Sequence, residues 1–387
     1  MKNMTKNGAV FCIASIVVLV LSACISTESG PQQRQPQQQQ EQQQPRVPGG
    51  PWRAHPPGDP AQVQQTREKI RQARSLMNRN DVHDIGYIWM MPRGDTLKDL
   101  TTRLDEWPQT RALVDIIGFA DHVLNRLYSD EELSQSFAVL NRIGLPLAME
   151  VGAVKEWAID GEAAFFAQKP MWDRFIRLGA TIAGIVMDEP LVAVMNATRF
   201  TFLETERERF DFAVEETVTF MRLVREHYPR WFIADIEVYP HFDADLNIQW
   251  VDALESRLID EGIRGQDFYR MDVDWNSIPR INTADWEHGW REVKRIEDHC
   301  RSLGLPFSMI YWAADAGASA RIRMTPSRWL EGIMRMGEAY ETAGGRPDQF
   351  DIQTWIAEFP PVALPETEEF TFTHSVLEFN QRFIPAR

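Results

Sequence analysis

The chain has 387 residues, of which 44% are hydrophobic and 25% are charged, and its formal net charge is −15 at neutral pH. This acidic balance argues against a nucleic-acid-binding protein, because phosphate binding requires a basic face. The length and the apolar content are sufficient for one large hydrophobic core.

The first 23 residues have the pattern of a targeting segment. Lys2 and Lys6 form a positively charged start, and residues 10–21 form an apolar run without charge. This run is short for a permanent membrane span. It ends in Leu21-Ser22-Ala23-Cys24, which resembles the lipobox of bacterial lipoproteins. The alternative is an ordinary secretory peptide with a cysteine at this position by chance.

The lipobox resemblance implies that residues 1–23 are removed and that the thiol of Cys24 carries a lipid such as palmitate. We therefore expect a cell-envelope location, with the membrane as a partner through Cys24. Ile25 stands where an inner-membrane retention signal would have Asp, so the outer membrane is expected in a host that has one. Cys300 is then the single cysteine of the folded part, and no internal disulfide is expected.

Residues 24–60 are rich in Gln and Pro and contain few large apolar side chains. Such a segment cannot bury enough surface to offset its ordering entropy, so we expect a disordered, lipid-anchored linker. Residues 61–387 have a globular composition with no second linker, which predicts one domain, expected to be a monomer.

Short apolar runs predict eight strands, each suited to burial on both faces of a parallel sheet. Their expected ranges are 84–90, 114–119, 145–151, 181–187, 231–238, 268–273, 306–312 and 350–356.

Amphipathic stretches separate these runs and predict helices. Ser129 and Glu132 form a capping box for a helix that ends near Gly144. Residues 210–228, 286–304 and 326–344 also have helical spacing.

Eight alternating strand–helix units predict a single (β/α)8 TIM barrel, an α/β fold. A doubly wound open sheet is the alternative. It usually has a glycine-rich phosphate turn after its first strand, and Met91-Pro92-Arg93-Gly94 is not such a turn.

Carboxylates stand at the predicted ends of strands three to six. In a barrel these ends meet at one mouth, where TIM-barrel active sites lie. Because side chains alternate along a strand, we expect Asp235 and Glu237 to share one face, and we place that face in the barrel interior. The complete set is Glu150, Asp188, Glu189, Asp235, Glu237, Asp272 and Asp274.

Aromatic residues are expected on the same rim, where flat rings could stack on sugars. They are Trp89, Tyr239, Trp275, Tyr311, Trp312 and Trp355. Carboxyl groups ringed by aromatic faces suit glycosidic bond cleavage, because one carboxyl protonates the leaving oxygen while another attacks the anomeric carbon or activates water.

The tripeptide Asp188-Glu189-Pro190 resembles the Asn-Glu-Pro that ends the fourth strand in a large clan of retaining barrel glycosidases. This resemblance implies that Glu189 is the acid/base. Asp188 replaces the Asn of that pattern, and an Asp-Glu pair here also resembles the substrate-assisted hexosaminidases. The clan's nucleophile, a Glu that ends the seventh strand, has no counterpart in residues 309–312.

We therefore expect a membrane-anchored, glycoside hydrolase-like enzyme with a carbohydrate substrate and without cofactor or metal. Glu189 is the expected general acid, and Glu237 or Asp272 is the base or nucleophile. The remaining carboxylates and the rim aromatics are expected to bind substrate. The alternatives are a non-catalytic glycan-binding lipoprotein and a metal-dependent TIM-barrel hydrolase or isomerase.

Overall fold

The computed structural model describes residues 52–55, 58–76, 85–155, 157–196, 200–278, 286–313, 325–354 and 362–384. The predicted signal segment, Cys24 and Trp355 lie outside these residues, as does most of the predicted linker.

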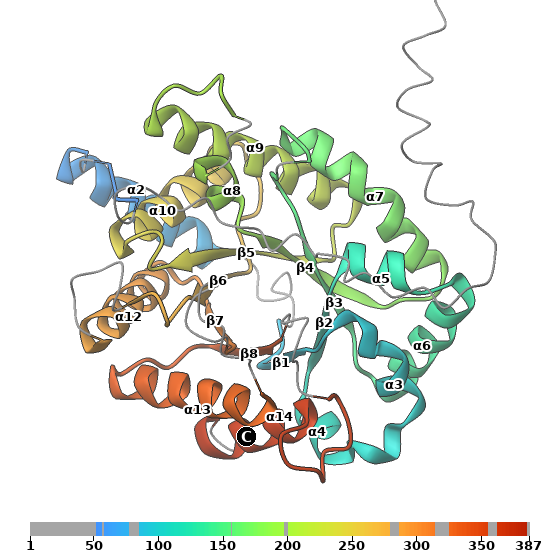
Figure 1. Ribbon diagram of the computed structural model, residues 1–387. Coiled ribbons are helices and arrows are strands. Elements are labelled where there is room, and N and C mark those ends of the chain that lie inside the picture. Colours follow the sequence, from blue (N-terminus) through green and yellow to red (C-terminus); the bar gives the residue numbers. More distant parts are fainter. Residues whose placement is uncertain are drawn as a thin grey trace, which may run out of the picture. The chain divides into compact units, whose positions relative to one another are not determined.

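Eight parallel strands form a closed barrel in chain order, which confirms the predicted fold. The last strand returns to the first, with Met90 opposite Ile352. Figure 1 shows the helices outside the ring of strands. The strands are β1 (Ile88–Met91), β2 (Ile116–Ala120), β3 (Leu147–Val151), β4 (Ile182–Asp188), β5 (Phe232–Tyr239), β6 (Phe268–Val273), β7 (Phe307–Tyr311) and β8 (Gln349–Gln353).

Every predicted strand overlaps an observed one, and the helical stretches between them also form. The helices are α2 (Pro60–Leu76), α3 (Leu97–Thr102), α4 (Pro108–Leu113), α5 (Asp121–Leu127), α6 (Asp130–Ile143), α7 (Gly161–Arg177), α8 (Pro190–Asn196), α9 (Glu206–His227), α10 (Ala244–Asp260), α12 (Trp286–Leu303), α13 (Pro326–Thr342) and α14 (Phe372–Phe383), with short 3-10 turns η2 (Gly94–Thr96) and η3 (Leu104–Glu106).

Local sequence explains where several helices begin and end. Helix α6 begins with the capping box of Ser129 and Glu132, as predicted. Gly144 and Gly304 then end α6 and α12 in the left-handed conformation, with φ of 72° and 76°. An L side chain is disfavoured at such φ values, which accounts for glycine at both helix-to-strand joints.

Helix α2 is an element that the sequence analysis did not predict. It packs against α10 and α12 before the chain enters the barrel. Arg74 of α2 forms a buried ion pair with Glu255 of α10 at 2.8 Å. Further upstream, the N–H of Trp52 donates to the carbonyl of His241 at 3.0 Å. Residues before β1 therefore contact the barrel domain.

Apolar side chains fall into two clusters, one inside the barrel and one between the strands and the helices. On β5, Phe232, Ala234 and Ile236 belong to the interior cluster. Asp235 and Glu237 alternate with them and therefore face outward, toward the helices. The expectation that this pair lies in the barrel interior was wrong. Alternation separates the two faces of a strand, but it does not show which face points into the barrel.

The barrel interior is polar at its centre. Arg270 of β6 forms an ion pair with Asp351 of β8 at 2.6 Å, and both side chains are at most 1% exposed. The same guanidinium donates to Ser308 and Gln349, and it lies 4.1 Å from the ring centroid of Trp89. These contacts link β1, β6, β7 and β8 below the mouth.

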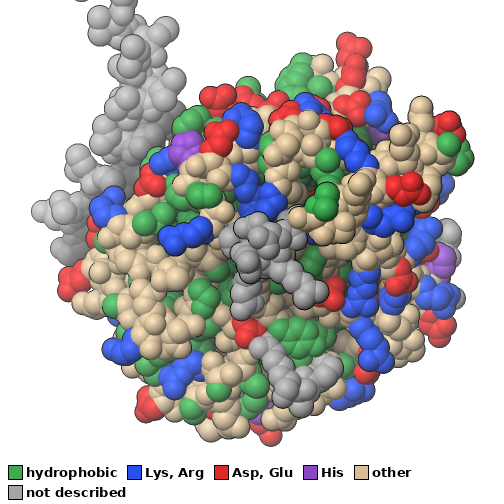
Figure 2. Space-filling model, turned by 180° about the vertical axis from the view of Figure 1, so that it is seen from behind, with side chains coloured by type: hydrophobic (Ala, Val, Ile, Leu, Met, Phe, Trp, Pro, Cys, Tyr) green, Lys and Arg blue, Asp and Glu red, His purple; other side chains and the backbone are tan. Residues whose placement is uncertain are grey.

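Figure 2 shows acidic and basic side chains interspersed over the described surface that is visible in this view. Charged pairs on the outer helices include Arg257 of α10 with Glu215 of α9. Within the described ranges, none of the helices combines the length and apolar character needed to cross a bilayer.

Candidate active site

Four carboxyl groups lie at the mouth of the barrel, where strands β3, β4 and β6 end. We call Glu150, Asp188, Glu189 and Asp272 the mouth cluster. All four are partly accessible to solvent. They also interact electrostatically, since Asp188 raises the pKa of each of the other three. The strand ends thus bring together predicted site residues that lie up to 122 positions apart.

Glu189 has an unusual backbone conformation, with φ of 51°. Its N–H donates to the carbonyl of Ile236 on β5 at 3.0 Å, and Pro190 then begins α8. A left-handed conformation costs a non-glycine residue roughly 1–3 kcal/mol and is concentrated at functional sites. Burial, followed by the charge of Asp188, raises the pKa of Glu189 to about 7. Glu189 is therefore poised to hold or release a proton near neutral pH.

Asp188 is paired with a lysine that the sequence analysis did not single out. Lys155, from the loop after β3, lies 2.8 Å from a carboxylate oxygen of Asp188. Burial lowers the pKa of Lys155, but the charges of Asp188 and Glu189 outweigh it and the net shift is upward. Lys155 consequently remains an ammonium group beside the mouth cluster.

Glu150 accepts a hydrogen bond from the amide of Gln353 at 3.0 Å, which joins the ends of β3 and β8. Burial and the charge of Asp188 raise the pKa of Glu150 to about 8. Glu150 is therefore protonated at neutral pH and can donate as well as accept a hydrogen bond.

Asp272 accepts a hydrogen bond from the indole of Trp312 at 2.5 Å. Burial and the charge of Glu189 raise the pKa of Asp272 well above its ordinary value. Asp274 lies two residues further on, 3.5 Å from the ring of His241 and 2.5 Å from the hydroxyl of Ser277. Burial acts to raise the pKa of Asp274, but these bonds bring it below its ordinary value, so this carboxylate stays ionised.

Asp235 and Glu237 have no exposed surface. Asp235 accepts a hydrogen bond from the indole of Trp250 on α10 at 2.5 Å, and Glu237 accepts one from the N–H of Leu191 on α8 at 2.6 Å. Burial raises the pKa of both groups well above the ordinary values. Their position behind the strand separates them from the mouth cluster and does not suit the expected contact with substrate.

Three of the five predicted rim aromatics that the structure describes lie away from the mouth. Trp89 is 1% exposed in the interior cluster, and its indole N–H donates to the carbonyl of Ile85, which precedes β1. Tyr239 is buried, and Tyr311 packs against Phe379 of α14. These three positions are corrections to the expected rim, because each side chain is enclosed by neighbouring elements.

Two of the predicted rim aromatics, Trp312 and Trp275, do lie near the mouth. Trp312 contacts the mouth cluster through its bond to Asp272. Trp275 donates its indole N–H to the carbonyl of Trp312 and packs against Trp286 at the start of α12. Both are 9% exposed, so they support the mouth and offer little ring surface.

Across the described part of the chain, no group of three or more His, Cys, Asp and Glu side chains is arranged to hold a metal ion. The mouth cluster consists of carboxyl groups, and its partners Lys155 and Gln353 add an ammonium group and an amide. These are the groups of proton-transfer and hydrogen-bonding chemistry. Sequence reasoning missed Lys155 and Gln353 because neither is marked by a motif; only the folded strand order brings them to the mouth.

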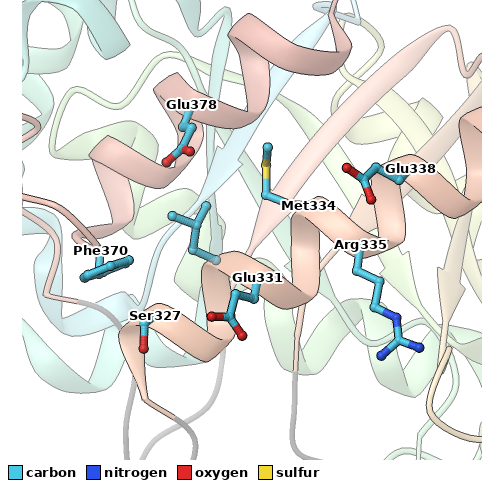
Figure 3. A pocket seen from close by; sticks show the side chains of 8 residues that line it. Ser327, Glu331, Met334, Arg335, Glu338, Phe370 and Glu378 are labelled. Atoms are coloured by element: carbon cyan, nitrogen blue, oxygen red, sulfur yellow. The ribbon is translucent and has the colours of Figure 1, made fainter.

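A hollow of about 610 Å³ lies between α13 and α14 (Figure 3). It is formed by outer helices, and no member of the mouth cluster lines it. Its lining residues are Ser327, Leu330, Glu331, Met334, Arg335, Glu338, Phe370 and Glu378.

No protein-family model matches the chain, and no curated protein matches its sequence. Solved structures with a similar fold include a protein from Bacteroides thetaiotaomicron assigned as an alpha-L-fucosidase, with 10% identity, coverage of 78% of this chain and 94% of that one, and a TM-score of 0.46. Xylanase XynB from Paenibacillus barcinonensis has 14% identity, coverage of 70% and 83%, and a TM-score of 0.43. D-psicose 3-epimerase has 12% identity, coverage of 78% and 100%, and a TM-score of 0.41. Since such likenesses concern the fold alone, the chemistry has to be argued from this chain's own side chains.

Proposed function

We propose that this protein is a glycoside hydrolase that uses Glu189 as general acid and Asp272 as the second carboxyl group. The observation that carries the proposal is the conformation of Glu189. This residue is held in left-handed backbone at the end of β4, partly accessible, among other carboxyl groups. Strained backbone at the mouth of a barrel is a feature of functional positions.

The reaction needs one protonated and one ionised carboxyl group. The charge of Glu189 raises the pKa of Asp272, so ionisation of one group opposes ionisation of the other. The reactive state in this proposal is the one in which Glu189 holds a proton and Asp272 is ionised. Glu189 donates that proton to the glycosidic oxygen as the bond to the anomeric carbon breaks. Asp272, ionised and held by the indole of Trp312, assists attack at that carbon, directly or by taking a proton from water.

The other polar groups suit substrate binding. The ion pair of Lys155 and Asp188 and the hydrogen-bonded pair of Glu150 and Gln353 present donors and acceptors for sugar hydroxyls. The excess of carboxyl groups disfavours an acidic sugar at the mouth, so we propose a neutral poly- or oligosaccharide as substrate. The raised pKa of Lys155 argues against a Schiff-base mechanism, which needs a neutral amine.

The test is hydrolysis of a panel of neutral polysaccharides by purified residues 47–387, measured as released reducing ends. We expect turnover of at least one glycan and a loss of about 100-fold or more in the Glu189→Gln variant, the scale of general-acid catalysis. Unchanged turnover in that variant would overturn the assignment. Circular dichroism of the variant would establish that the barrel is intact.

We also propose that a lipid on Cys24 attaches the protein to a membrane of the cell envelope. The support is the lipobox-like Leu21-Ser22-Ala23-Cys24 and the Gln- and Pro-rich segment that follows it. Metabolic labelling with palmitate in a bacterial host should mark the wild-type chain and not the Cys24→Ser variant. Equal labelling of both chains would exclude Cys24 as the lipidation site.

A further inference from the structure

The loop between β3 and α7 presents a tryptophan to solvent. Trp157 is 52% exposed, which is unusual for the largest apolar side chain. This loop follows the C-terminal end of β3 and therefore lies on the mouth face of the barrel. Trp157 was not among the aromatic residues expected there.

Three described residues of this loop, Gly152, Lys155 and Ala158, form backbone hydrogen bonds. The side chain of Gln168 on α7 accepts a hydrogen bond from the N–H of Gly152 at 3.0 Å and donates one to its carbonyl at 2.6 Å. Lys155 and Ala158 exchange two backbone hydrogen bonds of 3.3 and 3.0 Å. Hydrogen bonds thus hold Gly152, Lys155 and Ala158, the described neighbours of the exposed indole, and such preorganisation lowers the entropic cost of binding a ligand.

The indole also lies close to the backbone that leads from the mouth cluster. A Cβ atom at Gly152 would be 2.9 Å from Cζ2 of Trp157 and 2.7 Å from Cγ of Lys155. Gly152 is two residues beyond Glu150, and Lys155 pairs with Asp188. Trp157 therefore packs beside the residues that supply and support the mouth cluster.

We infer that Trp157 forms a sugar-binding subsite at the edge of the barrel mouth, on which a pyranose ring of a neutral glycan stacks. The inference rests on the proposed function and adds a specific binding residue to it. A sugar ring has an apolar face and a hydroxyl-bearing edge. The indole covers the apolar face, while the neighbouring ammonium and carboxyl groups of Lys155 and Asp188 provide hydrogen bonds for hydroxyls.

The test is affinity gel electrophoresis in gels that contain xylan, mannan, mixed-linkage β-glucan or soluble starch. The Glu189→Gln background is used so that the glycan in the gel is not degraded. At least one of these glycans should retard the protein, and Trp157→Ala should weaken that retardation by about tenfold or more, as expected for loss of a tryptophan anchor. Trp157→Phe should restore part of it, because a smaller aromatic face remains.

Ile176→Ala is the matched control. Ile176 is an apolar residue of α7 that is 43% exposed at the other end of that helix, so its truncation should leave retardation unchanged. In the active enzyme, the Trp157→Ala loss should appear mainly in KM, whereas a structural role would lower the melting temperature.

The outcomes separate this inference from the proposed hydrolysis. Retardation that is equal in the Trp157→Ala variant and its parent overturns the subsite and leaves the role of Glu189 untouched. Retardation that depends on Trp157 without any release of reducing ends by the wild-type enzyme supports the subsite and overturns hydrolysis. If none of the four glycans retards the protein, the subsite is overturned.

Discussion

The backbone N–H of Leu191 donates to the Glu237 carboxyl group at 2.6 Å. This bond lies on the outer, helix-facing side of β5, next to the β4–α8 junction that contains Glu189. Leu191 is the second residue of α8, which begins immediately after Glu189. Glu189 also donates its own N–H to Ile236 of β5. Strand β5 therefore holds the segment around Glu189 at two points, and Glu237 acts as a positioning residue.

We expect Glu237→Ala to reduce kcat by about tenfold or more and to destabilise the fold by roughly 1–3 kcal/mol, since a buried N–H loses its acceptor. Glu237→Gln should retain most of the activity, because the amide oxygen still accepts the bond from the N–H of Leu191. Steady-state kinetics and urea unfolding of both variants are the measurements. Equal kinetic loss in both would indicate a need for the charge.

The pH dependence should follow Glu189. A general acid is active only while protonated, and the pKa of Glu189 is raised to about 7. We therefore expect kcat/KM to fall as pH rises through about 7. The residual kcat/KM of the Glu189→Gln variant should not show this fall as the pH rises. A wild-type rate that stays constant from pH 6 to 9 would contradict the role of Glu189 as proton donor.

Glu150 should make stability depend on pH. Its pKa in the folded state is about 8, compared with an ordinary value of 4.5, so the folded state holds the proton more tightly. The contribution of Glu150 to the free energy of unfolding is fully present below about pH 4.5 and is lost as the pH rises toward 8. Glu150→Gln, which mimics the protonated form, should raise the melting temperature at pH 8 and leave it unchanged at pH 4. A gain of equal size at both pH values would contradict this account.

The buried pair of Arg270 and Asp351 should be costly to break from one side. Arg270→Met leaves Asp351 as an uncompensated buried charge, with an expected loss of roughly 3–5 kcal/mol in the free energy of unfolding. The double variant with Asp351→Leu should recover much of that loss. Urea denaturation of the single and double variants measures both effects, and additive losses would show that the pair is not coupled.

The sequence predicted the architecture well because the signals for it are local. Eight apolar runs mark the strands, and Ser129 and Glu132 mark the start of a helix. Both glycine joints, at Gly144 and Gly304, show the left-handed backbone that ends a helix. Alternation also grouped Asp235 with Glu237 on one face correctly.

The side of the barrel on which that face lies was not predicted, because period-two alternation is symmetric between interior and exterior. Apolar neighbours are present on both sides of a β5 strand that is buried throughout, so they give no indication of direction. The prediction of the rim aromatics was wrong for a related reason. Trp89 and Tyr311 are apolar, so they can be buried inside the barrel or between the strands and the helices. Trp157 was missed because it lies in a loop that carries no motif.

The contact between β1 and β8 has a consequence for how the domain assembles. Strand β1 pairs with β2 and with β8, and β8 begins 258 residues after β1 ends. Both neighbours of β1 are therefore in place only after the last strand has been synthesised. Until then Arg270 lacks the carboxylate of Asp351, so a chain truncated before β8 would leave a charge in an open, apolar sheet. The barrel thus completes its fold as one cooperative unit, and only after its C-terminal part has been synthesised.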